Sequence, residues 1–241
     1  MNVEPRVLWN AFKQFMVQIY QDSMLIILCI APILCGSFFK FILPWIEDKV
    51  AFYLPLHDIL QQYYLLFDLF LCAVTPLLYC FAAAYVILSE VDEGLTRYLA
   101  VTPIGKLGYL ITRMGIPAVL SFFIGILMLG IFRISDISIV EIVAVSLVTS
   151  LLGIVTALVV VALSANKVEG MAISKLTGLL SLGLPAPFFI TGPLQYLLCW
   201  LPSFWISKFV LDKNIMFIII GFLISLIWIY LLYDKFDKKI R

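Results

Sequence analysis

Long apolar runs separated by short polar stretches dominate the chain. Six runs are predicted to cross a membrane as helices, because about 20 apolar residues span the hydrocarbon core of a bilayer. The predicted spans cover residues 24–45, 63–88, 107–132, 139–163, 176–190 and 215–233. No repeat or low-complexity tract separates them. We therefore expect an all-α integral membrane protein with a single transmembrane domain over residues 1–241.

Two further segments have a pattern that does not fit a membrane span. In residues 5–21, apolar side chains recur at helical spacing on one face and polar side chains occupy the other, which predicts an amphipathic helix lying in the membrane interface. Residues 194–206 are apolar and aromatic but too short to span, and they contain Pro202. This pattern predicts an external re-entrant segment within residues 191–213.

The composition confirms that the apolar runs are not the core of a soluble domain. Hydrophobic residues make up 63% of the chain and charged residues 13%, against about 45–50% and about 25% in soluble domains. The mean hydropathy is +1.11. Too few polar side chains remain to cover a water-facing surface. A soluble enzyme, a nucleic-acid-binding module and a disordered protein are all excluded, and the lipid bilayer is the first expected partner.

The distribution of basic residues predicts the orientation. With six spans, eleven of the 16 Lys and Arg residues fall on the side of the two termini. The positive-inside rule then places both termini, and the polar segments 89–106 and 164–175, in the cytoplasm. If residues 194–206 crossed the bilayer, the number of spans would become odd. The basic C-terminal tail would then face outward, against this rule.

Several kinds of chemistry are excluded by missing motifs. The five cysteines lie in apolar stretches without a CxxC pair or a nearby histidine, so no metal site is expected. The single histidine, His57, falls in a predicted external loop, and HExxH is absent. Residues 92–97 resemble the acidic motif of the CPBP intramembrane proteases, but that family needs histidines on later helices. No GxxxxGK[ST] loop is present, so ATP would have to be bound by another polypeptide.

The spans offer few charges that could guide a substrate. Asp68 is embedded in the second run, where it either pairs structurally near the outer interface or contacts a substrate or ion. Pro76 predicts a kink in the second span, and Pro185 and Pro187 break the fifth span late. Aromatic, methionine and small side chains suit an apolar or amphipathic cargo better than an ion. The possible substrate path comprises Asp68, Pro76, Pro185 and Phe188.

The polar segment 89–106 follows the second span. It begins with an acidic cluster, continues with a short amphipathic stretch, and is stopped by Thr102-Pro103. A short exposed helix between two spans could transmit force from a docking partner. The alternative is a plain loop whose charges only enforce topology.

The residues of this segment resemble a known family. The run EVDEGLTRYLAVTPIGKLGYLITR, residues 90–113, looks like the coupling region of ABC type-2 exporter permeases, although Leu95 separates Gly94 from the threonine that commonly follows it. Residues 166–189 are similar to a region of small bacterial drug-export permeases, among them fluoroquinolone exporters. Residues 201–208 carry a third similarity before the last span.

This resemblance implies a transport subunit rather than an enzyme. The subunit would export an amphipathic or hydrophobic substrate such as a drug, an antimicrobial peptide or a lipid. It would pair with a second permease, the same or paralogous, and with two copies of a subunit that binds ATP and Mg. The contacts implied for that subunit are Glu90, Asp92, Glu93, Gly94, Thr96, Arg97, Tyr98, Thr102, Pro103 and Lys106.

A second possible contact lies in the segment 164–175. Its charged residues are Lys167, Glu169 and Lys175, and an equally open alternative is that they only anchor the topology. Two other functions also remain open for the whole chain. One is a non-energised membrane immunity or sensor protein, and the other is an intramembrane enzyme.

Overall fold

The computed structural model describes residues 5–53, 60–95 and 105–240. Helix makes up 88% of the structure and the described residues form no strand, which confirms the all-α prediction. Within these described ranges, five helical stretches are long and apolar enough to cross a membrane. They are Ser23–Val50, Gln61–Asp92, Gly108–Phe132, Ile139–Leu163 and Ile215–Lys239.

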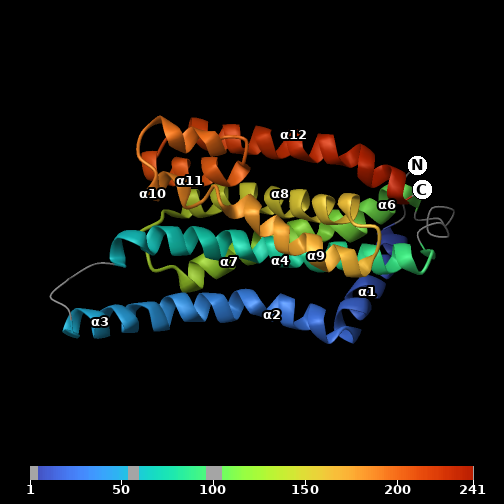
Figure 1. Cartoon of the computed structure of the whole chain (residues 1–241). Coiled ribbons are helices and arrows are strands. Elements are labelled where there is room, and N and C mark those ends of the chain that lie inside the picture. Colours follow the sequence, from blue (N-terminus) through green and yellow to red (C-terminus); the bar gives the residue numbers. More distant parts are fainter. Residues whose placement is uncertain (1–4, 54–59, 96–104, 241) are drawn as a thin grey trace.

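These stretches form a lengthwise bundle in which α2, α4, α7, α8 and α12 run side by side (Figure 1). The first stretch joins α2 (Ser23–Ser37) to α3 (Leu43–Tyr53) through a π-helical turn, η1 (Phe38–Ile42). The next is α4 (Tyr64–Asp92), preceded by η2 (Gln61–Tyr63). The remaining helices of the bundle are α6 (Gly105–Leu110), η3 (Ile111–Gly115), α7 (Ile116–Phe132), α8 (Ile139–Leu163) and α12 (Ile215–Ile240).

The core lies where α4 packs against α8. Gly153 permits this close approach, because a Cβ there would lie 2.8 Å from both the Pro76 carbonyl oxygen and the Cys80 Sγ. Leu152 and Val155 flank Gly153 and are fully buried. By contrast, α2 and α12 expose long rows of isoleucine and leucine side chains. Apolar side chains on the outside are expected of helices that face lipid.

The amphipathic helix predicted over residues 5–21 is present as α1 (Pro5–Gln21). It runs at a steep angle to the long helices at the end of the bundle where both chain termini lie (Figure 1). Ala11 and Phe15 face the bundle and are buried, whereas Trp9 and Tyr20 are exposed. Its position in a membrane interface stays a prediction.

The predicted span 176–190 is not one continuous helix. Here the chain forms the end of α9 (Lys167–Thr177), a 3-10 turn η4 (Gly178–Ser181) and the short α10 (Ala186–Phe189). The α-helix already ends at Thr177, ahead of the prolines. Pro185 and Pro187 lack the amide hydrogen that a helix interior needs, and they stand at the start of α10, where a proline is tolerated. The count of six membrane helices therefore stays a prediction, with five long apolar helices found in the described residues.

The segment after α10 folds back on the bundle. It consists of η5 (Pro193–Leu198) and α11 (Pro202–Asp212). The Trp228 indole of α12 donates to the Trp200 carbonyl, and the Ser203 hydroxyl donates to the Leu180 carbonyl. Lys213 then forms an ion pair with Glu141 at the start of α8. This return is compatible with the predicted re-entrant segment, whose depth in a membrane stays a prediction.

Candidate functional site

A buried carboxylate braces the end of the bundle where the termini lie. Glu90, in the last turn of α4, is only 2% exposed. Its carboxylate accepts hydrogen bonds from Arg113 Nη2 at 2.5 Å, from Arg113 Nε at 3.2 Å and from the Tyr109 hydroxyl at 2.9 Å. The Gln18 amide of α1 donates to it as well, at 3.3 Å. A buried carboxylate needs such compensation, because it has lost its hydration.

Arg113 extends this brace to the N-terminal helix. Its Nη1 donates to the Ala11 carbonyl at 3.0 Å, and its guanidinium lies over the Phe15 ring, 5.3 Å from the centroid. The Glu90–Arg113 brace therefore fastens α1, α4 and η3 to one another. Sequence reasoning proposed Glu90 as a contact for a partner, but its side chain is enclosed within the chain. Arg113 was not identified as a site residue from the sequence, although an arginine within an apolar run indicates a charge that needs a partner.

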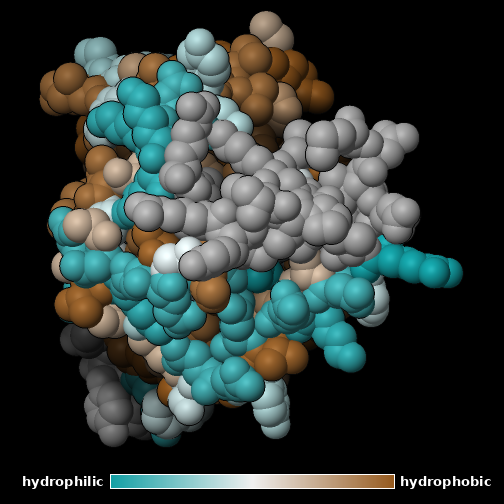
Figure 2. All heavy atoms as spheres, turned by 90° about the vertical axis from the view of Figure 1, so that its right-hand side faces the viewer, coloured by the Kyte–Doolittle hydropathy of each residue, from teal (hydrophilic) through white to brown (hydrophobic). Residues whose placement is uncertain are grey.

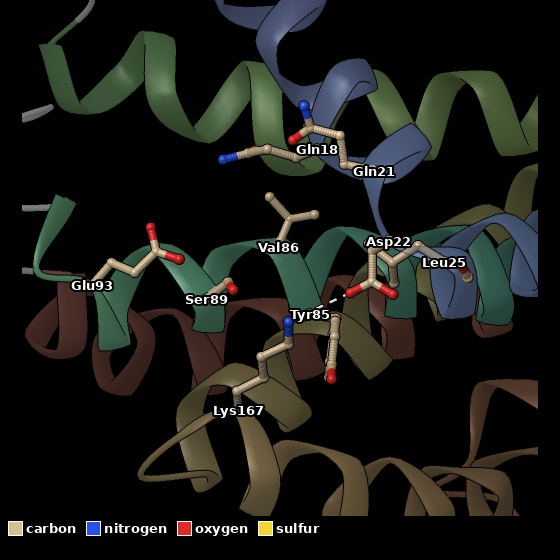
Figure 3. Close-up of a pocket in the computed structure, with 10 residues that line it drawn as sticks. Gln18, Gln21, Asp22, Leu25, Tyr85, Val86, Ser89, Glu93 and Lys167 are labelled. Atoms are coloured by element: carbon tan, nitrogen blue, oxygen red, sulfur yellow. Dashed lines mark hydrogen bonds and ion pairs between the residues drawn. The ribbon is translucent and has the colours of Figure 1, made fainter.

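A polar pocket of about 440 Å³ lies beside the brace. It is formed where the α1–α2 elbow, the last turns of α4 and the start of α9 meet (Figure 3). The side chains that line it are Gln18, Gln21, Asp22, Ser23, Leu25, Tyr85, Val86, Ser89, Glu93 and Lys167. Two of them, Glu93 and Lys167, were predicted from the sequence as contact residues.

The two predicted contact segments meet at this pocket. The Asp92 carboxylate at the end of α4 accepts a hydrogen bond from the Lys167 backbone amide at 2.8 Å. The Lys167 ammonium lies 3.5 Å from the Asp22 carboxylate and 4.3 Å from the centroid of the Tyr85 ring. Glu169 accepts from the Ala165 amide and helps to begin α9. Residues 75 positions apart thus form one polar surface.

Gly94 marks the end of α4 within the predicted docking segment 89–106. Its φ of +71° lies in the left-handed region, which glycine adopts without strain, and it ends α4 at this point. The Lys106 backbone belongs to α6. The predicted contacts Thr96, Arg97, Tyr98, Thr102 and Pro103 lie outside the described residues.

Figure 2 views this end of the bundle along the long helices. Hydrophilic side chains gather on it, while hydrophobic side chains appear around its edge. The charged residues of the polar pocket lie at this end. The last turns of α12, which carry Lys235 and Lys238, end here as well. This end therefore has the composition of a surface that faces water.

An apolar groove of about 660 Å³ runs from near the polar pocket toward the middle of the bundle. It lies between α2, α4 and the stretch α9–η4. Its lining consists of Met24, Leu28, Val74, Leu77, Leu78, Phe81, Val168, Met171, Ala172, Ser174, Lys175, Thr177, Gly178 and Ser181. The Tyr85 hydroxyl reaches the Met171 sulfur at 3.6 Å, so Tyr85 stands between the polar pocket and the apolar groove.

Lys175 belongs to the apolar groove and not to the polar pocket. It lies eight residues beyond Lys167 along α9, or about 12 Å at the rise of an α-helix. The sequence grouped Lys175 with Lys167 and Glu169 as one possible contact. The structure separates it from them, because the helical rise carries it toward the middle of the bundle.

The proposed substrate-path residues do not line this groove. Pro76 is buried against α8, while Pro185 and Phe188 are half-buried near α11. Asp68 is fully buried, and it accepts hydrogen bonds from the Ser135 amide at 2.8 Å, the Ser135 hydroxyl at 2.5 Å and the Ile134 amide at 3.1 Å. Its carboxylate fastens the α7–α8 loop to α4.

Replacing Asp68 with alanine should lower the free energy of unfolding by about 2 kcal/mol, because partly buried donors of the α7–α8 loop lose their acceptor. The measurement is the melting temperature of the purified chain. Asp136→Ala in the same loop is the matched control and should have little effect, since Asp136 is exposed. A substrate or ion role predicts the opposite pattern, in which Asp68→Ala abolishes transport while the melting temperature stays unchanged.

The described residues show no group of three or more His, Cys, Asp or Glu side chains that could hold a metal ion. All five cysteines are free, and Cys72 and Cys80 are buried in the core. The candidate site consists of the buried Glu90–Arg113 ion pair, the polar pocket and the apolar groove.

The family model and the similar proteins found by comparison point to the same family. A family model for "Fluoroquinolones export permease protein Rv2686c-like" matches residues 15–233. Two similar proteins are the fluoroquinolones export permease proteins MT2760 and Rv2686c from two strains of Mycobacterium tuberculosis. Each is 28% identical over 199 residues, which cover 78% of this chain and 75% of the relative. No solved structure matches.

Proposed function

Since this chain belongs to the Rv2686c-like family of fluoroquinolones export permeases, we propose that it is the membrane subunit of an ATP-driven ABC exporter. It is a multi-pass membrane protein built from apolar helices. Its cargo is an amphipathic or hydrophobic compound, and the names of the two relatives favour a drug. Energy comes from two copies of a separate subunit that binds ATP and Mg.

The observation that carries this proposal is the braced polar end. The end of α4 and the start of α9 meet there through Asp92 and Lys167, and Asp92 belongs to the segment whose sequence resembles a coupling region. The Glu90–Arg113 brace ties the same end of α4 to α1 and η3. A force applied at this end is thus passed to several helices together. Glu93 is exposed beside the pocket and is free to contact a partner.

The motor subunit drives transport by favouring one of two permease conformations, since a partner shifts an equilibrium only by its differential affinity. Closure of the two motor subunits on ATP would push on α4 and on the start of α9. These elements border the apolar groove, so a change in their tilt alters its shape. The groove is the proposed route of the substrate. The outward direction of transport is inferred from the family, whose members are named export permeases.

The polar end is proposed to face the cytoplasm of a bacterial cell, because most Lys and Arg residues of the sequence fall on the side of the two termini by the positive-inside rule. A second permease, identical or paralogous, would complete the transporter. The exposed apolar rows on α2 and α12 offer area for this pairing or for lipid.

The proposal is tested by co-expressing the tagged full chain with a candidate ATP-binding subunit that carries a Walker motif. We expect the two polypeptides to purify together and the complex to hydrolyse ATP faster when a fluoroquinolone is added. A variant of the partner without its Walker lysine serves as control and should still assemble without hydrolysing ATP. Purification of the chain without any nucleotide hydrolase would contradict the proposal and favour a non-energised membrane protein.

A further inference from the structure

The apolar groove contains one charged side chain among its lining residues, Lys175. This residue lies in the last turn of α9, about 12 Å along the helix from the polar pocket. In pockets that bind small molecules, a few polar or charged groups on largely apolar walls fix the orientation of the ligand and give specificity. Lys175 is exposed to the groove, and in the described part of the chain no carboxylate pairs with it.

The other polar groups of the groove have already used their donors. The Ser174 hydroxyl donates to the Met171 carbonyl at 2.8 Å, and the Thr177 hydroxyl donates to the Ser174 carbonyl at 2.6 Å. The Ser181 hydroxyl donates to the Gly178 carbonyl at 2.6 Å. Among the described lining residues, the Lys175 ammonium is thus the cationic donor left for a ligand.

We propose that Lys175 makes the groove selective for amphiphiles that carry an anionic group, with the ammonium binding a carboxylate of the exported compound. This inference rests on the proposed function, and it adds a residue that determines specificity. The remaining walls are leucine, valine, methionine and phenylalanine side chains, which match an apolar ring system. A volume of about 660 Å³ is in the range of pockets that hold small molecules, about 300–1,000 Å³.

The occupant is an exported compound and not a lipid. Lys175 lies away from the polar end of the bundle, where the headgroup of a lipid in that leaflet would be expected, and toward the middle of the groove. An anion on a compact ring system can reach this position while its apolar body stays between α2 and α4.

The test compares a fluoroquinolone with the methyl ester of its carboxylate. Binding of each compound to the purified full chain in nanodiscs of neutral lipid is measured by equilibrium dialysis. The unaltered chain should bind the acid about fivefold more tightly than the ester, the difference given by about 1 kcal/mol for a partly exposed ion pair. Lys175→Gln should remove this preference and leave ester binding unchanged, whereas Lys175→Arg should keep it.

Lys235→Gln is the matched control, because Lys235 is an exposed lysine of α12 outside the groove, and this variant should keep the preference for the acid. Intact ester binding by Lys175→Gln shows that this variant is folded. If Lys175→Gln still prefers the acid, the inference is overturned while the proposed function stands. Displacement of the acid by added phosphatidylglycerol would overturn it in favour of a lipid headgroup. Binding of neither compound would contradict both proposals.

Discussion

Glu90→Ala should lower the free energy of unfolding of the purified chain by about 3–5 kcal/mol, the loss expected when one partner of a buried ion pair is removed. The reason is that Arg113, which is only 3% exposed, keeps its charge but loses the carboxylate. Tyr109 and Gln18 also lose an acceptor. For a chain of this length, such a loss corresponds to a drop in melting temperature of roughly 10 °C.

The measurement is thermal unfolding of the full chain in detergent, followed by the loss of helical circular dichroism. Glu93→Ala is the matched control, since Glu93 lies three residues further along and is exposed. It should shift the melting temperature little. The double variant Glu90→Leu/Arg113→Leu should recover much of the loss, because replacing both charges removes the uncompensated one. Equal melting temperatures for Glu90→Ala and Glu93→Ala would contradict the proposed role of the brace.

The brace also explains how a local contact reaches distant helices. Without it, α1 would be held to α4 and η3 mainly by the apolar packing of Ala11 and Phe15. With it, the Glu90 carboxylate of α4 accepts hydrogen bonds from Gln18 of α1, Tyr109 of α6 and Arg113 of η3. Loosening the brace should therefore weaken transport as well as stability.

Much of the helical pattern could be predicted from hydropathy alone. The predicted bounds 5–21 and 139–163 coincide with α1 and α8. The last helix extends past the predicted 215–233 to Ile240, because lysine is a good helix former and the apolar boundary is not a helix boundary. Residues 176–190 failed as a single helix because the two prolines and the 3-10 turn outweigh the apolar composition.

The site was harder to predict, because it depends on which helices are neighbours. The sequence identified Asp92, Glu93 and Lys167 as contact residues, but their proximity follows from the packing of α9 against the end of α4. Hydropathy treats Glu90 as one more polar residue of an exposed segment. Its burial becomes evident only when Arg113, 23 residues later, is placed beside it. The separation of Lys175 from Lys167 likewise needs the helical rise of α9.

Glu93→Lys should reduce export by at least about tenfold while the chain still folds and enters the membrane. Glu93 is exposed at the rim of the polar pocket, and no described residue pairs with its carboxylate. A lysine there would add a cation beside Lys167 and repel a basic group of the motor subunit. Placing like charges against each other across an interface costs several kcal/mol, which corresponds to more than tenfold in affinity.

Two readouts separate coupling from assembly of the fold. Accumulation of a fluoroquinolone in cells measures export, and drug-stimulated ATP hydrolysis by the purified complex measures coupling. Both should fall in Glu93→Lys, whereas the melting temperature of the chain should stay within a few degrees of the original.

Glu93→Gln should have a smaller effect, because it removes an attraction without adding a repulsion. Lys235→Glu, a reversal elsewhere on the same end, is the control and should keep most of the export. Undiminished export by Glu93→Lys would exclude this carboxylate from the contact with the motor, even if the Glu90–Arg113 brace behaves as expected.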